Sequence, residues 1–233
     1  MSVRLLVTRP EPDGERTAAA LRARGHDVTV APLLRLQAVD FTLTEAAYGG
    51  VVLTSANAAR AVARHPQRAK LTSLPAFAVG RRTAQAARAV GFGAVHSADG
   101  DKNDLVALLR ARFGAGHRPL LYLAGEHRAG DLAACGVPVE TAVVYRAVEV
   151  ERFPPAAAAA LGTLDGVLHF SPRSAETYLA CAARTGVLDR ALTPVHYCLS
   201  RQVAAPLAAA GAAAIRIAPR PQEAALIDLV GSS

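Results

Sequence analysis

The sequence predicts an α/β protein with two parallel-sheet domains, one inserted in the other and joined by a two-stranded β linker. Short aliphatic runs alternate with Ala- and Leu-rich segments of helical period along all 233 residues, which is typical of βα units around a parallel sheet. Segments of the first half recur, in order, in the second half. The order of these repeats also requires the chain to pass twice between the two copies.

Ten short runs have the β-branched and aliphatic character of strands in a parallel sheet. Gly, Pro or polar residues bound each run, and the segments between them have helical period. The ten divide naturally into two sheets of about five. The expected strands are Arg4–Thr8, Asp27–Pro32, Gly50–Leu53, Ala76–Val79, Ala94–His96, Leu120–Leu123, Val139–Tyr145, Gly166–Phe170, Val195–Leu199 and Ala214–Ile217.

The internal repeat places the domain boundaries. Residues 53–58 recur in character at 170–175, and residues 78–84 recur at 198–204. The opening unit, from residue 5 onward, matches the unit that begins at residue 121. One copy therefore occupies the middle of the chain, while the other is split between the two ends.

We accordingly expect a first domain of residues 1–34 plus 148–233 and a second of residues 39–142. Segments 35–38 and 143–147 would pair as the two-stranded linker. Two strands resist twisting more than one flexible linker does, yet they let domains open and close around a cleft.

The composition favours a small anionic ligand. Lys and Arg number 26 against 19 Asp and Glu, a formal net charge of +7, but only 5% of residues are aromatic. That is few for the stacking surface of a single-strand nucleic-acid binder, so we expect a polyanion such as a polycarboxylate and no nucleic acid. Genomic base bias is an alternative explanation of the many Arg and Ala residues.

Other features bear on location and on partners. No run approaches the roughly 20 apolar residues that cross a bilayer, and the first ten residues lack the apolar centre of a signal peptide. We therefore expect a cytoplasmic protein that does not contact a membrane. Cys135, Cys181 and Cys198 form no CxxC pair, so each is expected to be a small buried residue.

Hydroxyl, glycine and arginine residues gather where the predicted strands end. Ligands of open α/β sheets collect at the carboxyl ends of strands, beside helix N-termini, and Arg there can hold carboxylates in bidentate pairs. The alternative is that the hydroxyl residues only cap helices. The candidate binding residues are Arg9, Thr54, Ser55, Asn57, Gly80, Arg81, Thr83, Gly125, Ser171, Pro172, Arg173, Ser174 and Ser200.

Motifs for cofactors and metals are missing. Neither GxGxxG nor GxxxxGK[ST] occurs, so a dinucleotide or triphosphate site lacks its usual backbone. The seven histidines show no HxxxH or HExxH spacing, and there is no GxSxG elbow. We expect neither cofactor nor metal. Tyr145, in the second crossing, could act as a weak acid in the cleft or pack the linker.

The strand-end turns resemble those of the uroporphyrinogen-III synthase family. The resemblance rests on the order and spacing of short motifs over the whole chain. They are Thr8-Arg9-Pro10, Thr54-Ser55-Ala56-Asn57-Ala58, Ala78-Val79-Gly80 with Thr83-Ala84, Val144-Tyr145-Arg146 and Phe170-Ser171-Pro172-Arg173-Ser174-Ala175. The turn at residues 199–204 departs from the family, which usually has Gly and then Thr in this turn, because Ser200, Gln202 and Val203 stand here instead. Ser200 could supply the lost hydroxyl.

The resemblance implies two flavodoxin-like domains and a cofactor-free hydro-lyase of tetrapyrrole biosynthesis. Its substrate would be hydroxymethylbilane, which carries eight carboxylates. Loss of the terminal hydroxyl as water gives an azafulvene, ring D attacks it to form a spiro intermediate, and fragmentation and closure give uroporphyrinogen III with that ring reversed. Because the substrate closes unaided to the unreversed isomer, the main task is to hold one conformation.

By the same resemblance Tyr145 assists departure of the hydroxyl without being essential. Thr54, Ser55, Asn57, Gly80, Ser171, Ser174 and Ser200 would bind carboxylates largely through backbone N–H groups. We expect a monomer. The alternative function is a hinged small-anion binding protein without catalytic activity, since it would have the same fold, cleft and arginines.

Overall fold

The structure is a computed structural model that describes residues 2–44, 46–114, 116–127 and 132–231. It divides into two compact units, residues 1–35 with 148–233 and residues 36–147. Each unit is an α/β sandwich around one sheet, and the α/β fold class expected from the sequence is confirmed. Among the described residues, no helix is both long and apolar enough to cross a membrane.

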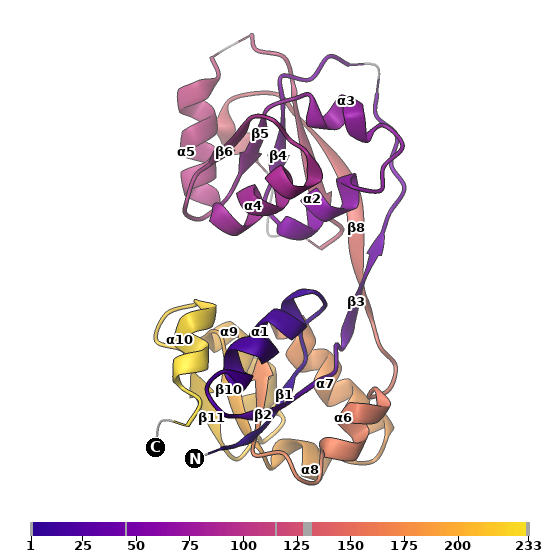
Figure 1. The fold of residues 1–233 in the computed structure, drawn as a ribbon, viewed down its shortest axis with the longest axis vertical. Helices are drawn as coiled ribbons and strands as arrows, with labels where there is room; N and C mark the ends of the chain where they lie inside the picture. The colour runs from indigo at the N-terminus through magenta and orange to yellow at the C-terminus, as the bar shows by residue number, and fades with distance from the viewer. Residues whose placement is uncertain (1, 45, 115, 128–131, 232–233) are drawn as a thin grey trace. The chain divides into compact units, whose positions relative to one another are not determined.

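The first unit has a five-stranded sheet in the order β11-β10-β9-β1-β2, and every described pairing in it is parallel (Figure 1). In chain order this is the 2-1-3-4-5 arrangement of flavodoxin-like folds. Its strands are β1 (Arg4–Val7), β2 (Asp27–Val30), β9 (Gly166–His169), β10 (Val195–Cys198) and β11 (Ile215–Ile217).

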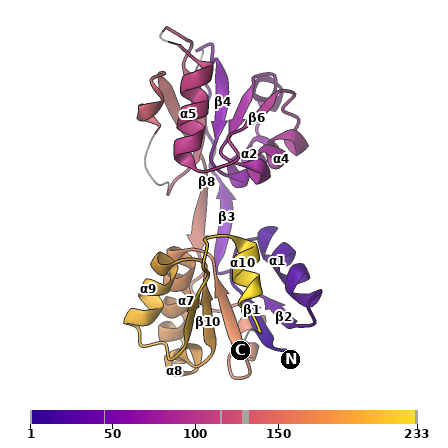
Figure 2. The same ribbon diagram turned by 90° about the vertical axis from the view of Figure 1, so that its left-hand side faces the viewer.

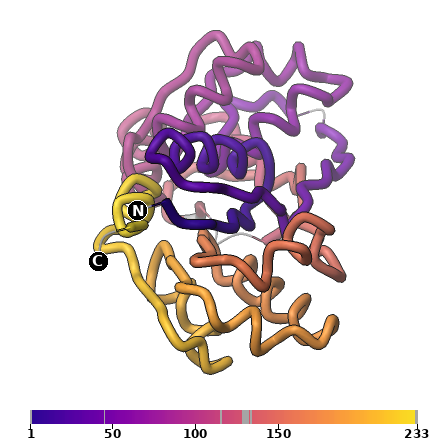
Figure 3. Tube along the Cα trace, turned by 60° about the horizontal axis from the view of Figure 1, so that its bottom comes forward, coloured from indigo at the N-terminus to yellow at the C-terminus, as the bar shows by residue number. Residues whose placement is uncertain are grey.

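Helices cover both faces of this sheet. Leu5 and Val7 point to the face under α1 and α10, whereas Leu6 points to the opposite core under α6, α7 and α9, as the two-residue period of a strand requires. Figure 3 shows α10 beside the N-terminal segment. The helices are α1 (Asp13–Arg22), α6 (Pro155–Ala160), α7 (Pro172–Arg184), α8 (Leu188–Leu192), α9 (Arg201–Ala209) and α10 (Glu223–Asp228).

The second unit has a six-stranded sheet in the order β3-β8-β7-β4-β5-β6. Helix α5 lies on one side of it, with α2 and α4 on the other (Figure 2). The elements are β3 (Leu34–Ala38), β4 (Gly50–Leu53), α2 (Ala56–Val62), α3 (Arg68–Thr72), β5 (Ala76–Ala78), α4 (Arg81–Val90), β6 (Val95–Ser97), α5 (Lys102–Arg112), β7 (Leu120–Gly125), the 3₁₀ turn η1 (Ala133–Cys135) and β8 (Val139–Glu149).

The two sheets share a spatial order but differ in connectivity. Strands β8-β7-β4-β5-β6 of the second unit occupy the places of β2-β1-β9-β10-β11 in the first. The sequence repeats follow this correspondence, since residues 53–58 follow β4 and residues 170–175 follow β9. The second sheet is thus a circular permutation of the first, which is why the repeat at residue 5 matches residue 121 rather than residue 50.

The ten expected strands are present, β4 with the expected ends and the other nine with one or both ends shifted, and β3 is an eleventh strand among the described residues, in the segment expected to form part of the linker. Strand β8 is the largest difference, because it continues to Glu149 instead of ending at Tyr145. Strand β8 pairs with β3. Two hydrogen bonds flank the paired segment: the Val39 N–H donates to the Val144 carbonyl at 3.0 Å, and the Val150 N–H donates to the Leu33 carbonyl at 3.0 Å. These opposed pairings are antiparallel. Segments 35–38 and 143–147 lie in β3 and β8.

Candidate active site

The strand-end turns of each unit lie along one edge of its sheet. In the second unit Leu53 pairs with both Ala78 and Leu123, so the turns after β4, β5 and β7 start side by side. In the first unit Val7 pairs with Leu168, and His169 pairs with Cys198, which aligns the turns after β1, β9 and β10. Parallel strands therefore bring the predicted residues of each unit to the edge where α/β proteins bind ligands.

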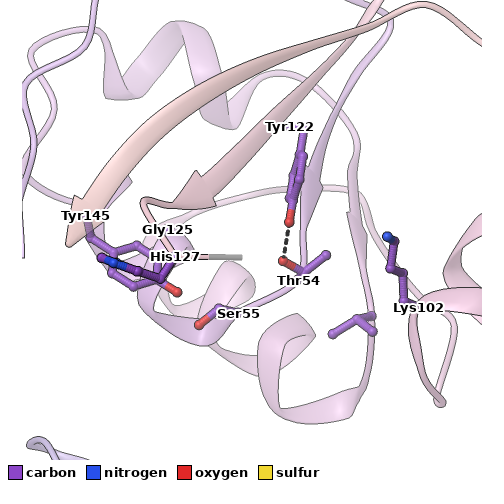
Figure 4. A pocket seen from close by; sticks show the side chains of 8 residues that line it. Thr54, Ser55, Lys102, Tyr122, Gly125, His127 and Tyr145 are labelled. Carbon is purple, nitrogen blue, oxygen red and sulfur yellow. Dashed lines mark hydrogen bonds between the residues drawn. The ribbon is translucent and has the colours of Figure 1, made fainter. Parts of the chain in front are cut away.

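A pocket of about 300 Å³ opens at this edge of the second unit. Figure 4 shows Tyr145 and His127 on one side of it and Lys102 on the other, with Thr54 and Ser55 between them. The structure brings together four of the predicted site residues here. The lining consists of Thr54, Ser55, Val79, Lys102, Tyr122, Gly125, His127 and Tyr145.

Hydroxyl groups form the centre of the pocket. The Thr54 Oγ1 and the Tyr122 phenol oxygen are hydrogen-bonded at 2.9 Å. Ser55 caps α2, and its Oγ accepts the Asn57 N–H at 3.1 Å. Because one lone pair of that oxygen satisfies the helix, capping and ligand binding are both open to Ser55. An anion here would meet hydroxyl donors and the start of a helix.

Tyr122 and Lys102 are pocket residues that the sequence reasoning missed. Tyr122 is an aromatic residue in the otherwise aliphatic strand β7 and is 4% exposed, with its phenol reaching the pocket edge. Lys102 opens α5 directly after the helix cap Asp101, and its side chain is half-buried. A lone phenol in an apolar strand was the available signal for Tyr122. Nothing in the local pattern distinguished Lys102 from a solvated helix residue.

The turn after β5 places Gly80, Arg81 and Thr83 at the start of α4. Arg81 is 87% exposed and pairs with Asp99 at 3.1 Å. The Ser97 hydroxyl, and next the Arg81 guanidinium, hold the pKa of the Asp99 carboxyl below its ordinary value. Thr83 is 6% exposed and lies inside the unit, so of these three residues Gly80 and Arg81 are the accessible ones. The remaining predicted residue of this unit, Asn57, accepts a hydrogen bond from Arg60 at 2.7 Å.

The turn after β9 begins α7 with a capping box. The Ser171 Oγ accepts the Ser174 N–H at 3.1 Å, and the Ser171 N–H donates to the Ser174 Oγ at 3.3 Å. Pro172 stands in the first turn, where its missing N–H costs nothing. The Arg173 guanidinium reaches Glu149 at 3.0 Å. Reciprocal capping explains the Ser-Pro-Arg-Ser pattern locally and leaves Ser171 partly exposed.

Ser200 caps α9 in the corresponding turn, where its Oγ accepts the Val203 N–H at 3.4 Å. It lies beside Arg201 in a hollow of about 430 Å³, whose other residues include Ile217 and Pro219. Val203 is 3% exposed and belongs to the apolar core. The serine at this turn therefore keeps a hydroxyl beside a helix N-terminus.

Arg9 has partners inside the first unit. Its guanidinium pairs with Glu223 of α10 at 3.1 Å and with Asp13 at 3.6 Å, and it donates to Thr17 at 3.1 Å. It also lies 4.2 Å over the ring of Phe170. With a side chain only 13% exposed, Arg9 links the turns after β1 and β9 to the C-terminal helix.

The described residues give little support for a metal site or for a cysteine nucleophile. No three His, Cys, Asp or Glu side chains among them gather as a metal-ligand set. Cys135, Cys181 and Cys198 are buried and free, as expected, and burial raises the pKa of the Cys198 thiol to about 12. With so high a pKa the Cys198 thiol is protonated near neutral pH and is a poor nucleophile.

Comparison with known proteins decides the family. The family model described as uroporphyrinogen-III synthase HemD matches residues 15–228. The chain belongs to the uroporphyrinogen-III synthase family. The match spans both units, and it confirms the resemblance expected from the strand-end turns. The family comprises hydro-lyases that cyclise hydroxymethylbilane.

Solved structures agree on the fold. The chain is similar to the uroporphyrinogen-III synthetase of Helicobacter pylori, with a TM-score of 0.67 and 18% identity over 98% of each chain. It is also similar to a mutant uroporphyrinogen III synthase from the extremely thermophilic bacterium Thermus thermophilus, with a TM-score of 0.52 and 18% identity over 97% of this chain and 96% of that one. A comparison with the curated proteins found no match.

Proposed function

We propose that this protein is a uroporphyrinogen-III synthase, which cyclises hydroxymethylbilane to uroporphyrinogen III with loss of water and reversal of ring D. The observation that carries the proposal is the family match over residues 15–228. The pocket that holds Tyr145 beside Thr54 and Ser55 supports it. The reaction belongs to tetrapyrrole biosynthesis, which leads to haem, chlorophyll and cobalamin.

Binding of the substrate carboxylates is the first task. Hydroxyl groups, backbone N–H groups at helix starts and arginines line the strand-end edge of each sheet, and each of these groups favours an anion. Thr54, Ser55 and Lys102 surround one pocket of the second unit. Ser171 and Ser200 cap helices at the same edge of the first. We propose that these groups hold the acetate and propionate side chains of the substrate.

Tyr145 is the proposed assisting acid. The C–O bond of the hydroxymethyl group breaks, the oxygen leaves as water, and the adjoining pyrrole becomes an azafulvene after losing its N–H proton. A phenol beside the departing oxygen can donate a hydrogen bond that stabilises the developing charge. The ring of Tyr145 lines the pocket that Thr54 and Ser55 also line (Figure 4).

Ring closure follows from the geometry of the bound chain. Ring D attacks the azafulvene carbon through its substituted position and forms a spiro centre, and the bond from that centre to the neighbouring methylene then breaks. The methylene rejoins ring D at its other side, and loss of a proton restores the aromatic pyrrole. Holding reacting atoms in place can replace a strong acid-base pair, because orientation alone lowers a barrier by several kcal/mol, roughly 7–11 in favourable cases.

The decisive experiment supplies enzymatically made hydroxymethylbilane and separates the two uroporphyrinogen isomers by chromatography after oxidation. We expect the type III isomer to exceed the type I isomer that forms without enzyme. Unchanged isomer proportions together with tight substrate binding would instead describe a small-anion binding protein.

We further propose that the enzyme works in the cytoplasm as a monomer. Three buried, unpaired cysteines suit a reducing compartment. Sedimentation velocity at micromolar concentration tests the oligomeric state, for which a single species near the 24.2 kDa chain mass is expected. A species of twice that mass would contradict the proposal.

A further inference from the structure

An irregularity in the β7–β8 ladder sets the direction of Tyr145. The two strands pair without interruption from Leu120 opposite Val139 to Ala124 opposite Val143. The next pair is Gly125 opposite Tyr145, so Val144 has no residue opposite it. This pattern is a β-bulge, which bends a strand and re-aims the side chain that follows it. Without the bulge, Gly125 would face Val144 instead.

Both residues of the bulged segment are fixed by their surroundings. Val144 is fully buried in the apolar core under α2 and α4. Beyond the bulge, the Glu126 N–H donates to the Tyr145 carbonyl at 2.9 Å. The buried side chain of Val144 and this hydrogen bond fix the bulged segment, so the bulge aims the ring of Tyr145 and the neighbours of the ring hold it there.

The ring of Tyr145 meets the bare backbone of Gly125. A Cβ atom added at Gly125 would lie 2.6 Å from Cζ of Tyr145, 2.8 Å from its phenol oxygen and 3.0 Å from Cε2. Real Cβ atoms do not approach other atoms so closely, so any larger residue at position 125 has to displace the ring. Glycine is needed here for close approach of the ring.

A close contact between a glycine and a tyrosine ring also occurs in the first unit, where it is ordinary core packing. The contact at Gly125 therefore bears on function only because of where its ring lies. A Cβ at Gly166 would lie 2.6 Å from the ring of Tyr197, but Tyr197 is 5% exposed and belongs to an apolar core. Tyr145 also packs against an apolar core, but it is only partly buried and lines the pocket with Thr54 and Ser55 (Figure 4).

We propose that Gly125, together with the bulge at Val144, is a positioning residue that holds the phenol of Tyr145 in the pocket. The inference rests on the proposed function, in which that phenol assists departure of the substrate hydroxyl. It assigns Gly125 a role through Tyr145 rather than through its own backbone contact with a substrate carboxylate.

The test compares Gly125→Ala, Tyr145→Phe and the double variant for kcat, KM and isomer ratio. Gly93→Ala is the matched control, because a Cβ at Gly93 meets nothing within 4 Å. We expect Tyr145→Phe to lower kcat on the order of tenfold, less than the roughly 10²–10⁴ lost with an essential acid. Gly125→Ala is expected to lower kcat by a similar factor with little change in KM, and the double variant to equal Tyr145→Phe alone.

Several results would overturn the inference. A normal kcat in Gly125→Ala would do so. So would a double variant whose loss of kcat is the product of the losses in the two single variants. A third such result is a rise in KM that Gly125→Ala causes equally in the wild-type and Tyr145→Phe backgrounds. The last result would indicate that Gly125 itself contacts the substrate. A wild-type enzyme that yields only the type I isomer would sink the proposed function instead.

A second measurement does not depend on activity or on a well-folded Gly125→Ala variant. Thermal unfolding midpoints are compared for Gly125→Ala in the wild-type and Tyr145→Leu backgrounds, because leucine lacks the ring atoms that the new Cβ would meet. We expect the substitution to lower the midpoint clearly in the first background and much less in the second. Equal decreases in both would show that Gly125 does not act on the ring, and would overturn the inference.

Discussion

His169 and His196 form a buried pair on neighbouring strands of the first unit. His169 Nε2 and His196 Nδ1 lie 3.0 Å apart, and both residues are fully buried. Burial, and next the charge of His196, keep the pKa of His169 well below its ordinary value, and burial lowers the pKa of His196 to about 4. The sequence placed both residues inside the sheet, but it gave no sign that they touch.

This pair predicts acid sensitivity of the first unit. Both imidazoles are neutral when folded, whereas in the unfolded chain they titrate near 6.5. As pH falls below about 6.5 the unfolded state binds protons that the folded state does not, so the free energy of unfolding decreases by roughly 1 kcal/mol per pH unit for each histidine. Above pH 7 the pair contributes no pH dependence.

Urea titrations between pH 4.5 and 8 measure this effect. The double variant His169→Leu/His196→Leu keeps a similar volume and removes both bases, so its unfolding free energy should fall less than that of the wild type below pH 6.5. The slopes above pH 7 should match and serve as the control. Equal slopes at low pH would mean that other groups cause the acid sensitivity.

At the scale of one element, the first turn of helix α7 allows the helix-capping role of a serine to be separated from a role in binding substrate. Ser171 begins the helix through a reciprocal bond with Ser174, and it remains partly exposed at the strand-end edge. The same oxygen could satisfy the helix alone or also face a substrate carboxylate. An aspartate at this position caps a helix as well as serine does, but it would repel an anion.

Two substitutions of Ser171 therefore separate the capping role from the binding role. Ser171→Ala should lower the free energy of unfolding by about 1 kcal/mol, because one helix N–H loses its acceptor. Ser171→Asp should keep the stability near that of the wild type and raise KM for hydroxymethylbilane several-fold. Chemical denaturation and steady-state kinetics on the same three proteins give both values. An unchanged KM in the aspartate variant would leave Ser171 with a capping role only.

At the scale of the whole molecule, charge is the main property that the sequence supplies. The net charge of +7 faces a substrate with eight carboxylates. Such a charge accelerates encounter through long-range attraction, which salt screens over a Debye length of about 10 Å at 0.1 M and about 3 Å at 1 M. Encounter, rather than chemistry, is the step that ionic strength should affect.

We expect kcat/KM for hydroxymethylbilane to decrease several-fold as NaCl rises from about 0.02 to about 0.5 M, whereas kcat at saturating substrate should change little. Fixed-time product assays at each salt concentration measure kcat/KM and kcat. A kcat/KM independent of salt would indicate that the basic residues reflect composition rather than steering. Tight binding to oligonucleotides at physiological salt would contradict the expectation of no nucleic-acid partner.

Pattern and repetition in the sequence were enough to predict the α/β class, the two sheets and the strand-end edges that hold Thr54, Ser55 and Gly125. The resemblance of the turn motifs predicted the family. Tyr145 was expected in the linker, and only the structure places it in the same pocket as these three residues. The class, the sheets and the edges follow from local periodicity and from parallel pairing, which puts the carboxyl ends of parallel strands on one side. Segment 35–38 was expected only as one strand of the linker, and the structure extends this strand to Leu34–Ala38 and makes it an edge strand of the second sheet, beside β8.

What the sequence determined by itself is the alternation of elements, their duplication and the chemical character of the turns, because each depends on neighbours along the chain. Tertiary structure alone decided which partners these turns have. Arg9 meets Glu223, Thr54 meets Tyr122, and the bulge turns Tyr145 over Gly125. Such contacts join residues distant in sequence, and their geometry depends on register and packing, which no local pattern records.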